Sequence, residues 1–496
     1  MFLLVLAIAV GSILLTVVGL LIYARWNYGT LEALNIPVVD RSFFLGSTPE
    51  LHKKVQHLED IERFNKYGPI YGVYEGRTPH IHVCDPELIR LIFVKDSDHF
   101  RNRREVELGD PIVNEMLDFL PYAKWKVLRQ MQTPSLTASK LKIMSTRVNE
   151  SAAEFVSYMG NKLEGSNGRA KFNTREVFVP LAIDIICRGL IGIPVHNPFD
   201  YSNEVCQSLE TISAEGQDSS ILYTLSFSFP FLSALAPTLA PDNIHYFANM
   251  FRKLIKVRSE DSIKNNDFMD KIVDMMHKLP TDEFKKLNVS EATVIAQALG
   301  PLMAGYDAIA AVSVFLSYYA ARDPQVQQRI TQEVDDHFEK YGEFRHENLG
   351  ELAYLHACVK ETLRLVPSFI RPERICTKDW EYNGLRIPAG VVVMIPAWGA
   401  NRNPEYFPDP EKFDPERFMD EQSTGLSQYA FSTFGHGPRN CIGLKFAYDA
   451  LKLSLCHVFR KFQFELRPDT EVKYKTGVLF LMQYYPILLD VVRRET

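Results

Sequence analysis

The stretch Phe434-Gly435-His436-Gly437-Pro438-Arg439-Asn440-Cys441-Ile442-Gly443 places one cysteine in a glycine-rich loop, and an apolar helical pattern follows it. A thiol at the start of a helix has a lowered pKa, because the helix dipole and the free N–H groups stabilise the thiolate. Gly437 and Gly443 let the backbone approach a flat ligand, since they carry no side chain. The alternative is a buried structural cysteine, because free cysteine is among the most buried residue types.

This order of residue types suits an iron porphyrin that is held by one thiolate. Arg439 can reach a haem propionate, and Phe434 can shield the sulfur from water. The spacing Phe434-x-x-Gly437-x-Arg439-x-Cys441-x-Gly443 resembles the signature of the cytochrome P-450 superfamily without a gap. The resemblance implies haem b as the cofactor and Cys441 as the ligand of its iron.

The resemblance covers nearly the whole chain. The segments 67–100, 361–374, 387–396 and 401–418 look like the microsomal clan of this superfamily, which includes drug-metabolising forms, arthropod detoxification enzymes and thromboxane synthase. Residues 108–111 and 227–235 look more like the arthropod enzymes. The resemblance implies a mainly α fold with small β-sheets, in a haem-thiolate domain of triangular outline. It also implies electrons from NADPH through cytochrome P-450 reductase, with cytochrome b5 as an optional second donor.

Length and composition agree with a large enzyme. The chain has 496 residues, of which 46% are hydrophobic, so it can bury a large core. Its seven cysteines are scattered without CxxC spacing, which favours a reducing compartment over a disulfide scaffold. The net charge of −6 gives no indication of a nucleic-acid partner.

The amino terminus predicts a membrane anchor. Residues 1–23 contain no charged side chain, and about 20 apolar residues suffice to cross a bilayer. No basic residue precedes this segment, whereas Arg25 and Arg41 follow it, which favours a cytosolic position for the rest of the chain. We therefore predict a single-pass anchor in the endoplasmic reticulum membrane at 1–23, a linker at 24–45 and a catalytic domain at 46–496.

Patterns of apolar residues predict the main elements. We expect short strands at 70–74, 80–83 and 391–395, and largely helical structure from 86 to 265. Further helices are expected at 290–322 and 356–365, with a terminal helix that ends near 462 and a closing β region at 474–492. The charge-free stretch from Ser219 to Pro241 contains Pro230 and Pro237 in its interior, and each of them would break a membrane span. We expect it to touch the membrane around a substrate entrance, and the alternative is a buried core helix.

Glu361 and Arg364 lie at i and i+3, on one face of a predicted helix. In the superfamily, the counterpart of Arg417 joins such a pair and fixes the segment that leads to the cysteine loop. The resemblance therefore makes these three residues structural rather than catalytic.

Further arginines match positions that contact the haem propionates in the superfamily. Trp125 and Arg129 lie at i and i+4 and resemble the helix that holds a propionate. Arg103 and Arg374 match two more such positions, and with Arg439 they give four arginines for two carboxylates. Arg101 and Arg104 are more simply interpreted as surface arginines near solvated acids.

Ala304-Gly305-Tyr306-Asp307-Ala308 matches the oxygen-binding segment of the superfamily, with Ala304, Gly305, Asp307 and Ala308 as the catalytic candidates. Small residues let the helix open beside the iron, and an acid followed by threonine relays protons to dioxygen. This chain keeps the acid and has Ala308 in place of the threonine. An alternative role for Asp307 is to cap backbone groups where the helix is broken.

The match also places the substrate pocket and the partner surface. Pocket positions fall near 111–120, 227–235 and 304–308, and at Ser368, Phe369, Ile370, Val478 and Leu479. Phe369 should narrow the pocket above the haem. Candidate contacts to the reductase are Lys124, Lys126, Lys445 and Lys452, although surface lysines are usually only solvated.

Three functions remain open from the sequence. The first is a monooxygenase that inserts one oxygen atom from dioxygen into lipophilic xenobiotics, steroids or fatty acids. The second is a haem-thiolate isomerase or dehydratase that acts on peroxides without dioxygen, and Ala308 supports it. The third is a degenerate haem protein that binds ligand without turnover. The retained Cys441 loop and Asp307 argue against this third function.

Overall fold

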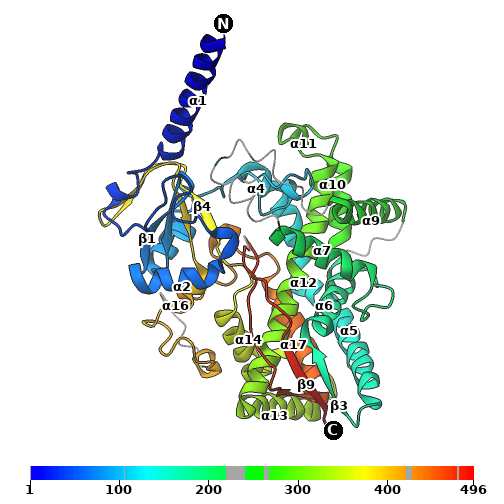
Figure 1. The fold of residues 1–496 in the computed structure, drawn as a ribbon. Coiled ribbons are helices and arrows are strands. Elements are labelled where there is room, and N and C mark those ends of the chain that lie inside the picture. The colour runs from blue at the N-terminus through cyan, green and yellow to red at the C-terminus, as the bar shows by residue number, and fades with distance from the viewer. Residues whose placement is uncertain are drawn as a thin grey trace.

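Helices dominate the computed structural model, which describes residues 2–105, 107–218, 229, 241–261, 267–419, 427–477 and 480–495 (Figure 1). The helices are α1 (Phe2–Arg25), α2 (Gln56–Tyr67), α3 (Pro86–Arg90), α4 (Tyr122–Gln132), α5 (Ala138–Glu164), α6 (Thr174–Asp184), α7 (Glu204–Asp218), α9 (Pro241–Glu260), α10 (Phe268–Lys278), α11 (Asp282–Lys286), α12 (Glu291–Arg322), α13 (Pro324–Tyr341), α14 (Ala353–Leu365), α15 (Ala397–Ala400), α16 (Ser427–Ala430) and α17 (Leu444–Lys461).

The strands form three small sheets. They are β1 (Ile70–Glu75), β2 (Thr78–Val83), β3 (Arg169–Asn173), β4 (Glu373–Ile375), β5 (Trp380–Tyr382), β6 (Leu385–Ile387), β7 (Val392–Met394), β8 (Phe462–Leu466) and β9 (Leu488–Arg493). Their orders are β1-β2-β7-β4, β3-β9-β8 and β5-β6. The sheet that contains β1 lies in a lobe beside the foot of α1, apart from the helical body (Figure 1). The predicted fold class, mainly α with small sheets, is confirmed.

Helix α12 is the central element of the helical body. Ser290 caps it in a capping box with Thr293, and Asp323 ends it before Pro324, as the sequence predicts. Most of its residues are buried, and it packs against α6, α9, α10, α14 and α17. The helix therefore crosses the main hydrophobic core, and its middle reaches the cavity described below.

Two details of the strands differ from what the sequence predicts. Strand β3 lies inside the region that we expected to be helical, and it pairs antiparallel with β9, so that Lys171 faces Asp490. A strand whose partner lies so far along the chain leaves little local signal, and Arg169 and Lys171 interrupt any apolar alternation. The closing β region reduces to β9 and single bridges such as Tyr474 with Tyr484.

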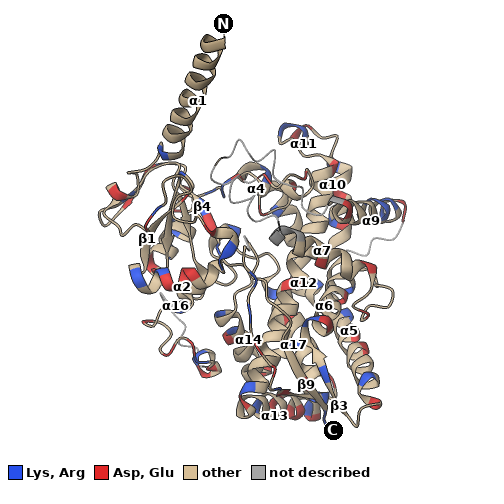
Figure 2. Cartoon of the chain, viewed as in Figure 1, with Lys and Arg blue, Asp and Glu red and all other residues tan. Residues whose placement is uncertain are grey.

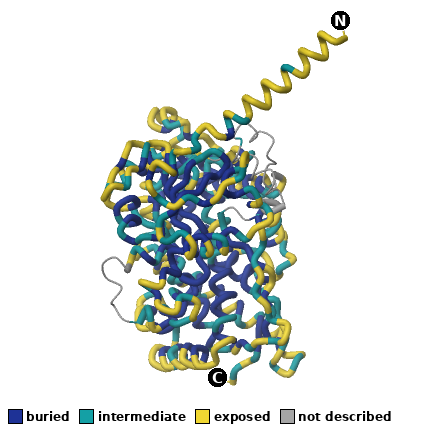
Figure 3. Tube along the Cα trace, turned by 60° about the vertical axis from the view of Figure 1, so that its left-hand side comes forward, coloured by how far each residue is buried: buried dark blue, intermediate teal, exposed yellow. Residues whose placement is uncertain are grey.

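Helix α1 stands away from the rest of the chain. It has 24 residues and is about 36 Å long at 1.5 Å per residue, enough to cross the hydrocarbon core of a bilayer. Most of its side chains are exposed, and none before Arg25 carries a charge, as Figures 2 and 3 show. At its foot, the Tyr23 ring lies 4.1 Å from the guanidinium of Arg77 and 6.3 Å from the ring of Phe229. The remainder of the charge-free stretch 219–241 lies outside the described residues, apart from the backbone of Pro241 at the start of α9.

Candidate active site

Cys441 lies in the loop between the turn Gly437–Arg439 and α17. Its N–H donates to the carbonyl oxygen of Phe434 at 2.9 Å, which fixes the loop. Gly437 has a φ of 70°, and a Cβ at this position would lie 1.8 Å from the carbonyl oxygen of Phe93. Glycine is therefore required at 437 by the approach of protein backbone, a reason that the sequence does not reveal.

The thiol of Cys441 differs from those of the other six cysteines, because they are buried and it is exposed. Its exposed surface faces an internal cavity, which Cys441 lines together with Gly443. Burial raises the pKa of Cys441, and a backbone hydrogen bond from Gly443 lowers it by less. The predicted lowering of the pKa by the helix start is therefore wrong for the chain alone. A metal ion would reverse this balance, since a coordinating thiol is deprotonated outright.

The cavity beside Cys441 has a volume of about 500 Å³, in the range of sites for small ligands. Its walls come from α4, α7, α12, the start of α17 and the loops that precede α4, β4 and β9. Much of its lining is apolar, for example Val113, Met116, Phe119, Ile309 and Phe480. An apolar cavity of this size fits a lipophilic molecule.

Six arginines also line this cavity. Four of them are the predicted propionate contacts Arg103, Arg129, Arg374 and Arg439, and the other two are Arg104 and Arg371. Arg439 donates to the backbone carbonyl oxygens of Arg101 at 3.0 Å and Leu120 at 2.9 Å. Its guanidinium lies 4.6 Å from the centre of the Trp125 ring. Trp125 is buried and does not line the cavity, so it contacts the site through Arg439.

The charges of these arginines are incompletely balanced by the chain. Burial lowers the pKa of Arg129, Arg374 and Arg439, and for Arg439 the pKa falls to about 9. Arg439 Nη1 and Arg103 Nε are buried and have no hydrogen-bond partner among the described residues. Such a cluster of cations suits a ligand that carries two carboxylates, as a haem does. The donor set and the single thiol therefore fit haem b.

The comparisons with known proteins agree with this chemistry. The model of the family described as Cytochrome P-450 matches residues 36–491. The chain belongs to the cytochrome P-450 family. It is 30% identical to cytochrome P-450 3A40 of Oryzias latipes over 484 residues, which are 96% of this chain and 95% of that protein. Cytochromes P-450 3A28 of Bos taurus and 3A9 of Rattus norvegicus are also 30% identical, over 97% of the chain and 94% and 96% of those proteins.

These findings confirm that this P-450 is a haem monooxygenase of the predicted clan. The likeness of residues 108–111 and 227–235 to arthropod enzymes stays a prediction.

The middle of α12 presents small residues to the cavity. Ala304, Gly305 and Ala308 all line it. A Cβ at Gly305 would lie 2.7 Å from Ile186 Cδ1, so a side chain here would have to displace Ile186 in the π-helical turn Ile185–Ile191. No hydroxyl stands at 308, where Ala308 replaces the threonine of the superfamily.

Asp307 is buried and is directed to protein partners rather than to the cavity, which it does not line. Its Oδ1 accepts from Arg175 Nη2 at 3.2 Å, and its Oδ2 accepts from Gln483 Nε2 at 3.0 Å. Burial raises the pKa of Asp307, and the ion pair with Arg175 opposes this. Arg175 in turn pairs with Glu210 at 2.8 Å. The carboxyl group therefore belongs to a buried polar chain behind the cavity wall.

The expected substrate positions divide into three groups. Ser368 and Phe369 line the cavity, as do Val113 and Met116 from the segment 111–120. Ile370 is buried and lies outside the cavity wall. Val478 and Leu479 lie outside the described residues, as does the segment 227–235 apart from Phe229. The sequence missed Phe480, Leu481 and Gln483, which line the cavity just after the predicted pair.

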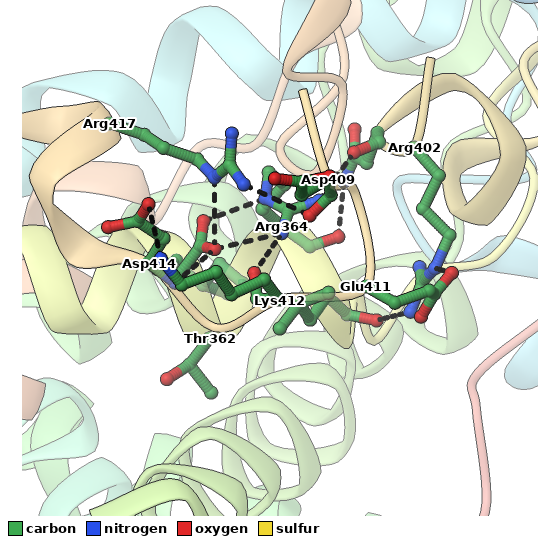
Figure 4. Close-up of polar contacts among 12 residues, drawn as sticks. Thr362, Arg364, Arg402, Asp409, Glu411, Lys412, Asp414 and Arg417 are labelled. Carbon is green, nitrogen blue, oxygen red and sulfur yellow. Dashed lines mark hydrogen bonds and ion pairs between the residues drawn. The ribbon is translucent and has the colours of Figure 1, made fainter. Parts of the chain in front are cut away.

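The carboxylate of Glu361 is surrounded by donors from Arg364, Arg417 and Asp414, which Figure 4 labels. Arg364 donates to it at 2.7 and 2.8 Å, and Arg417 Nε lies 3.5 Å from Glu361 Oε1. The N–H of Asp414 donates to the same oxygen at 2.8 Å, and Arg364 Nη2 donates to the carbonyl oxygen of Lys412 at 3.2 Å. These bonds tie α14 to the segment 409–417, which leads towards the cysteine loop.

Several basic residues lie elsewhere than predicted. Lys124 and Lys452 are buried, so they are wrong as docking contacts. Lys124 pairs with Glu115, and Lys452 donates to the carbonyl oxygen of Leu349 at 2.9 Å. Arg104 is half-buried, with its Nε 3.0 Å from Glu373 Oε2, and is no surface arginine. Lys126 and Lys445 are exposed, so they stay candidate docking contacts. Arg101 is exposed, as predicted.

Proposed function

We propose that this P-450 inserts one oxygen atom from dioxygen into lipophilic xenobiotics, steroids or fatty acids, with electrons from NADPH through a partner reductase. The observation that carries the proposal is the exposed thiol of Cys441 in a largely apolar cavity that Arg103, Arg129, Arg374 and Arg439 also line. The apolar walls support a lipophilic substrate. Relatives named cytochrome P-450 3A support the same substrate class.

In this proposal each group at the cavity has one task. Cys441 would hold the iron through its sulfur, and bound haem would supply the activation of dioxygen. Arg103, Arg129, Arg374 and Arg439 would bind the propionates, and Trp125 positions Arg439. Phe434 and Gly443 lie against the sulfur side of the cavity, where Phe434 excludes water and the N–H of Gly443 donates to the sulfur.

We infer that protons reach the site from the carboxyl group of Asp307. Burial raises its pKa, which favours proton uptake, and its Oδ2 accepts from Nε2 of Gln483, a residue that lines the cavity. Ala304, Gly305 and Ala308 leave room for dioxygen on the same helix. Water in this space would then replace the hydroxyl that the superfamily places at position 308.

One observation favours a second function. Ala308 brings no hydroxyl to the cavity, and Asp307 is turned away from it. A haem-thiolate isomerase or dehydratase acting on peroxides needs no proton relay to dioxygen. It is therefore the alternative to the monooxygenase.

We further propose that α1 anchors the enzyme in the endoplasmic reticulum membrane with the catalytic domain in the cytosol. There it would meet cytochrome P-450 reductase and, as an optional donor, cytochrome b5. Lys126 and Lys445 are exposed and remain the candidate docking contacts.

Product analysis separates the two functions. Purified protein, reductase and NADPH are incubated with a panel of lipophilic compounds under isotopically labelled dioxygen. The proposal predicts one labelled oxygen atom in the product. Unlabelled product together with rapid rearrangement of a hydroperoxide would establish the alternative.

A further inference from the structure

The arginines on the cavity wall differ in their acidic partners. Arg104 and Arg371 pair with buried carboxylates, at 3.0 and 2.7 Å between nitrogen and oxygen. Of the four predicted propionate contacts, only Arg103 forms an ion pair with a carboxylate among the described residues, and that carboxylate belongs to Asp118. Asp118 is therefore the one acidic side chain that directly balances a charge in this set of four arginines.

Arg103 holds the carboxylate of Asp118 in place. Arg103 Nη1 donates to Asp118 Oδ1 at 2.6 Å and to the backbone oxygen of Asp118 at 3.3 Å. The guanidinium carbon of Arg103 also lies 5.8 Å from the centre of the ring of Phe369, another residue of the cavity wall. An arginine has five N–H donors, so a guanidinium that uses Nη1 for Asp118 can still bind a propionate through its other nitrogens.

The Asp118 carboxylate also lies where it can act on a bound molecule. Asp118 lines the cavity, and its side chain is 62% exposed. The other two acidic residues that line the cavity in the described part of the chain are Glu75 and Glu373. Their side chains are 7% and 11% exposed, and both pair with Arg104. Asp118 is therefore the most accessible negative charge on this wall.

The charge of Asp118 acts on the arginines and on the thiol alike. Burial lowers the pKa of Arg374 and Arg439, and the charge of Asp118 opposes this shift in both. Burial raises the pKa of Cys441, and the charge of Asp118 raises it further. A charge that acts on the sulfur of Cys441 also acts on an iron bound to that sulfur. A negative charge near an iron stabilises its ferric state relative to its ferrous state.

We propose that Asp118 lowers the reduction potential of the bound haem. Arg103 fixes its carboxylate at the cavity wall, and this negative charge opposes the uptake of one electron by ferric haem. The electron comes from the partner reductase, so Asp118 acts on electron transfer and takes no part in bond breaking in the substrate. This inference rests on the proposed function, because it concerns the same haem and the same electron donor.

A redox titration of the haem-loaded protein, followed by its absorption spectrum, tests the proposal. It is run at low ionic strength, because salt screens accessible charges. Asp118→Asn keeps an oxygen for Arg103 and removes the charge, so the midpoint potential should rise. The equilibrium constant for reduction should increase about threefold, as expected for one accessible charge, which is about 30 mV at about 59 mV per tenfold change for one electron.

Two further variants separate charge from shape and from position. Asp118→Glu keeps the charge and should give the wild-type potential. Asp98→Asn is the matched control, because it removes a carboxylate from the exposed pair with Arg101 and should leave the potential unchanged. An unchanged or lower potential in Asp118→Asn would overturn the proposal. An equal rise in Asp118→Glu or in Asp98→Asn would also overturn it, because shape or net charge would then be the cause.

The carbon-monoxide spectrum distinguishes failure of this inference from failure of the proposed function. A thiolate-type spectrum in the wild-type protein, together with an unchanged potential in Asp118→Asn, would refute the role of Asp118 alone. Absence of that spectrum from the wild-type protein would refute the haem-thiolate function itself.

Discussion

Two groups of buried arginines differ in whether their positive charge is balanced within the chain. In the network of Figure 4, Arg364 is fully buried and donates twice to the carboxylate of Glu361. In the cavity, Arg374 and Arg439 are also buried, but they donate to neutral carbonyl oxygens, and burial lowers the pKa of each. The first group balances its charge within the chain. The second group carries positive charge that the chain does not balance, so a bound anion can balance it. This difference distinguishes a binding site from a purely structural network.

Removal of Arg364 should have the largest effect on stability. Arg364→Ala leaves the carboxylate of Glu361 buried with one partner fewer, which typically costs about 3–5 kcal/mol. We expect the free energy of unfolding in urea to fall by this amount and the haem content to fall with it. The control is Arg386→Ala, because Arg386 forms an exposed pair with Asp379 and should contribute about 0–1 kcal/mol. Equal losses of stability in the two variants would mean that the buried network around Glu361 contributes no more than an exposed ion pair.

Removal of a cavity arginine should act on haem retention rather than on folding. Arg439→Leu deletes a charged hydrogen-bond donor, worth about 1.5–3 kcal/mol, so haem should be lost about tenfold faster or more. Transfer of haem to apomyoglobin measures this rate. Arg101→Leu is the matched control, since Arg101 is exposed and pairs with Asp98. An unchanged rate for Arg439→Leu would mean that this arginine does not bind the haem.

The pKa of Arg439 also predicts how haem retention depends on pH. In the chain alone the pKa of Arg439 is about 9, and a bound carboxylate raises it. A group whose pKa rises on binding contributes affinity that is complete below the lower pKa and is lost as the pH rises through it. Haem retention should therefore weaken above about pH 9. The pH dependence of haem retention should be weaker in Arg439→Leu than in the wild-type protein. An equal pH dependence in both proteins would mean that another group causes it.

The smallest predicted effect concerns the missing hydroxyl. Ala308→Thr adds a hydroxyl to the cavity wall of α12, where the superfamily places one. If proton delivery limits the reaction, the fraction of NADPH converted to product should rise by a small factor. Product per NADPH consumed is the measurement. An unchanged fraction would mean that the route from Asp307 already suffices.

The sequence predicted those parts of the molecule whose signals are local. The start of α12 after Ser290, the strand predicted at 70–74 and the cysteine loop each depend on neighbouring residues, and the loop alone indicated the cofactor. Strand β3 could not be predicted, because its partner lies more than three hundred residues along the chain. The partners of Asp307 were missed for the same reason, since Arg175 and Gln483 come from distant segments. The burial of Lys124 and Lys452 likewise depends on packing that no local pattern records.

The carbon-monoxide difference spectrum of the reduced protein tests the central claim most directly, because it reports the ligand of the iron. The account predicts a thiolate-type spectrum for the wild-type protein and its complete loss in Cys441→Ser, with haem still present in the Arg101→Leu control. A thiolate-type spectrum that survives in Cys441→Ser would contradict the account, because the other six cysteines are buried and another ligand would have to hold the iron.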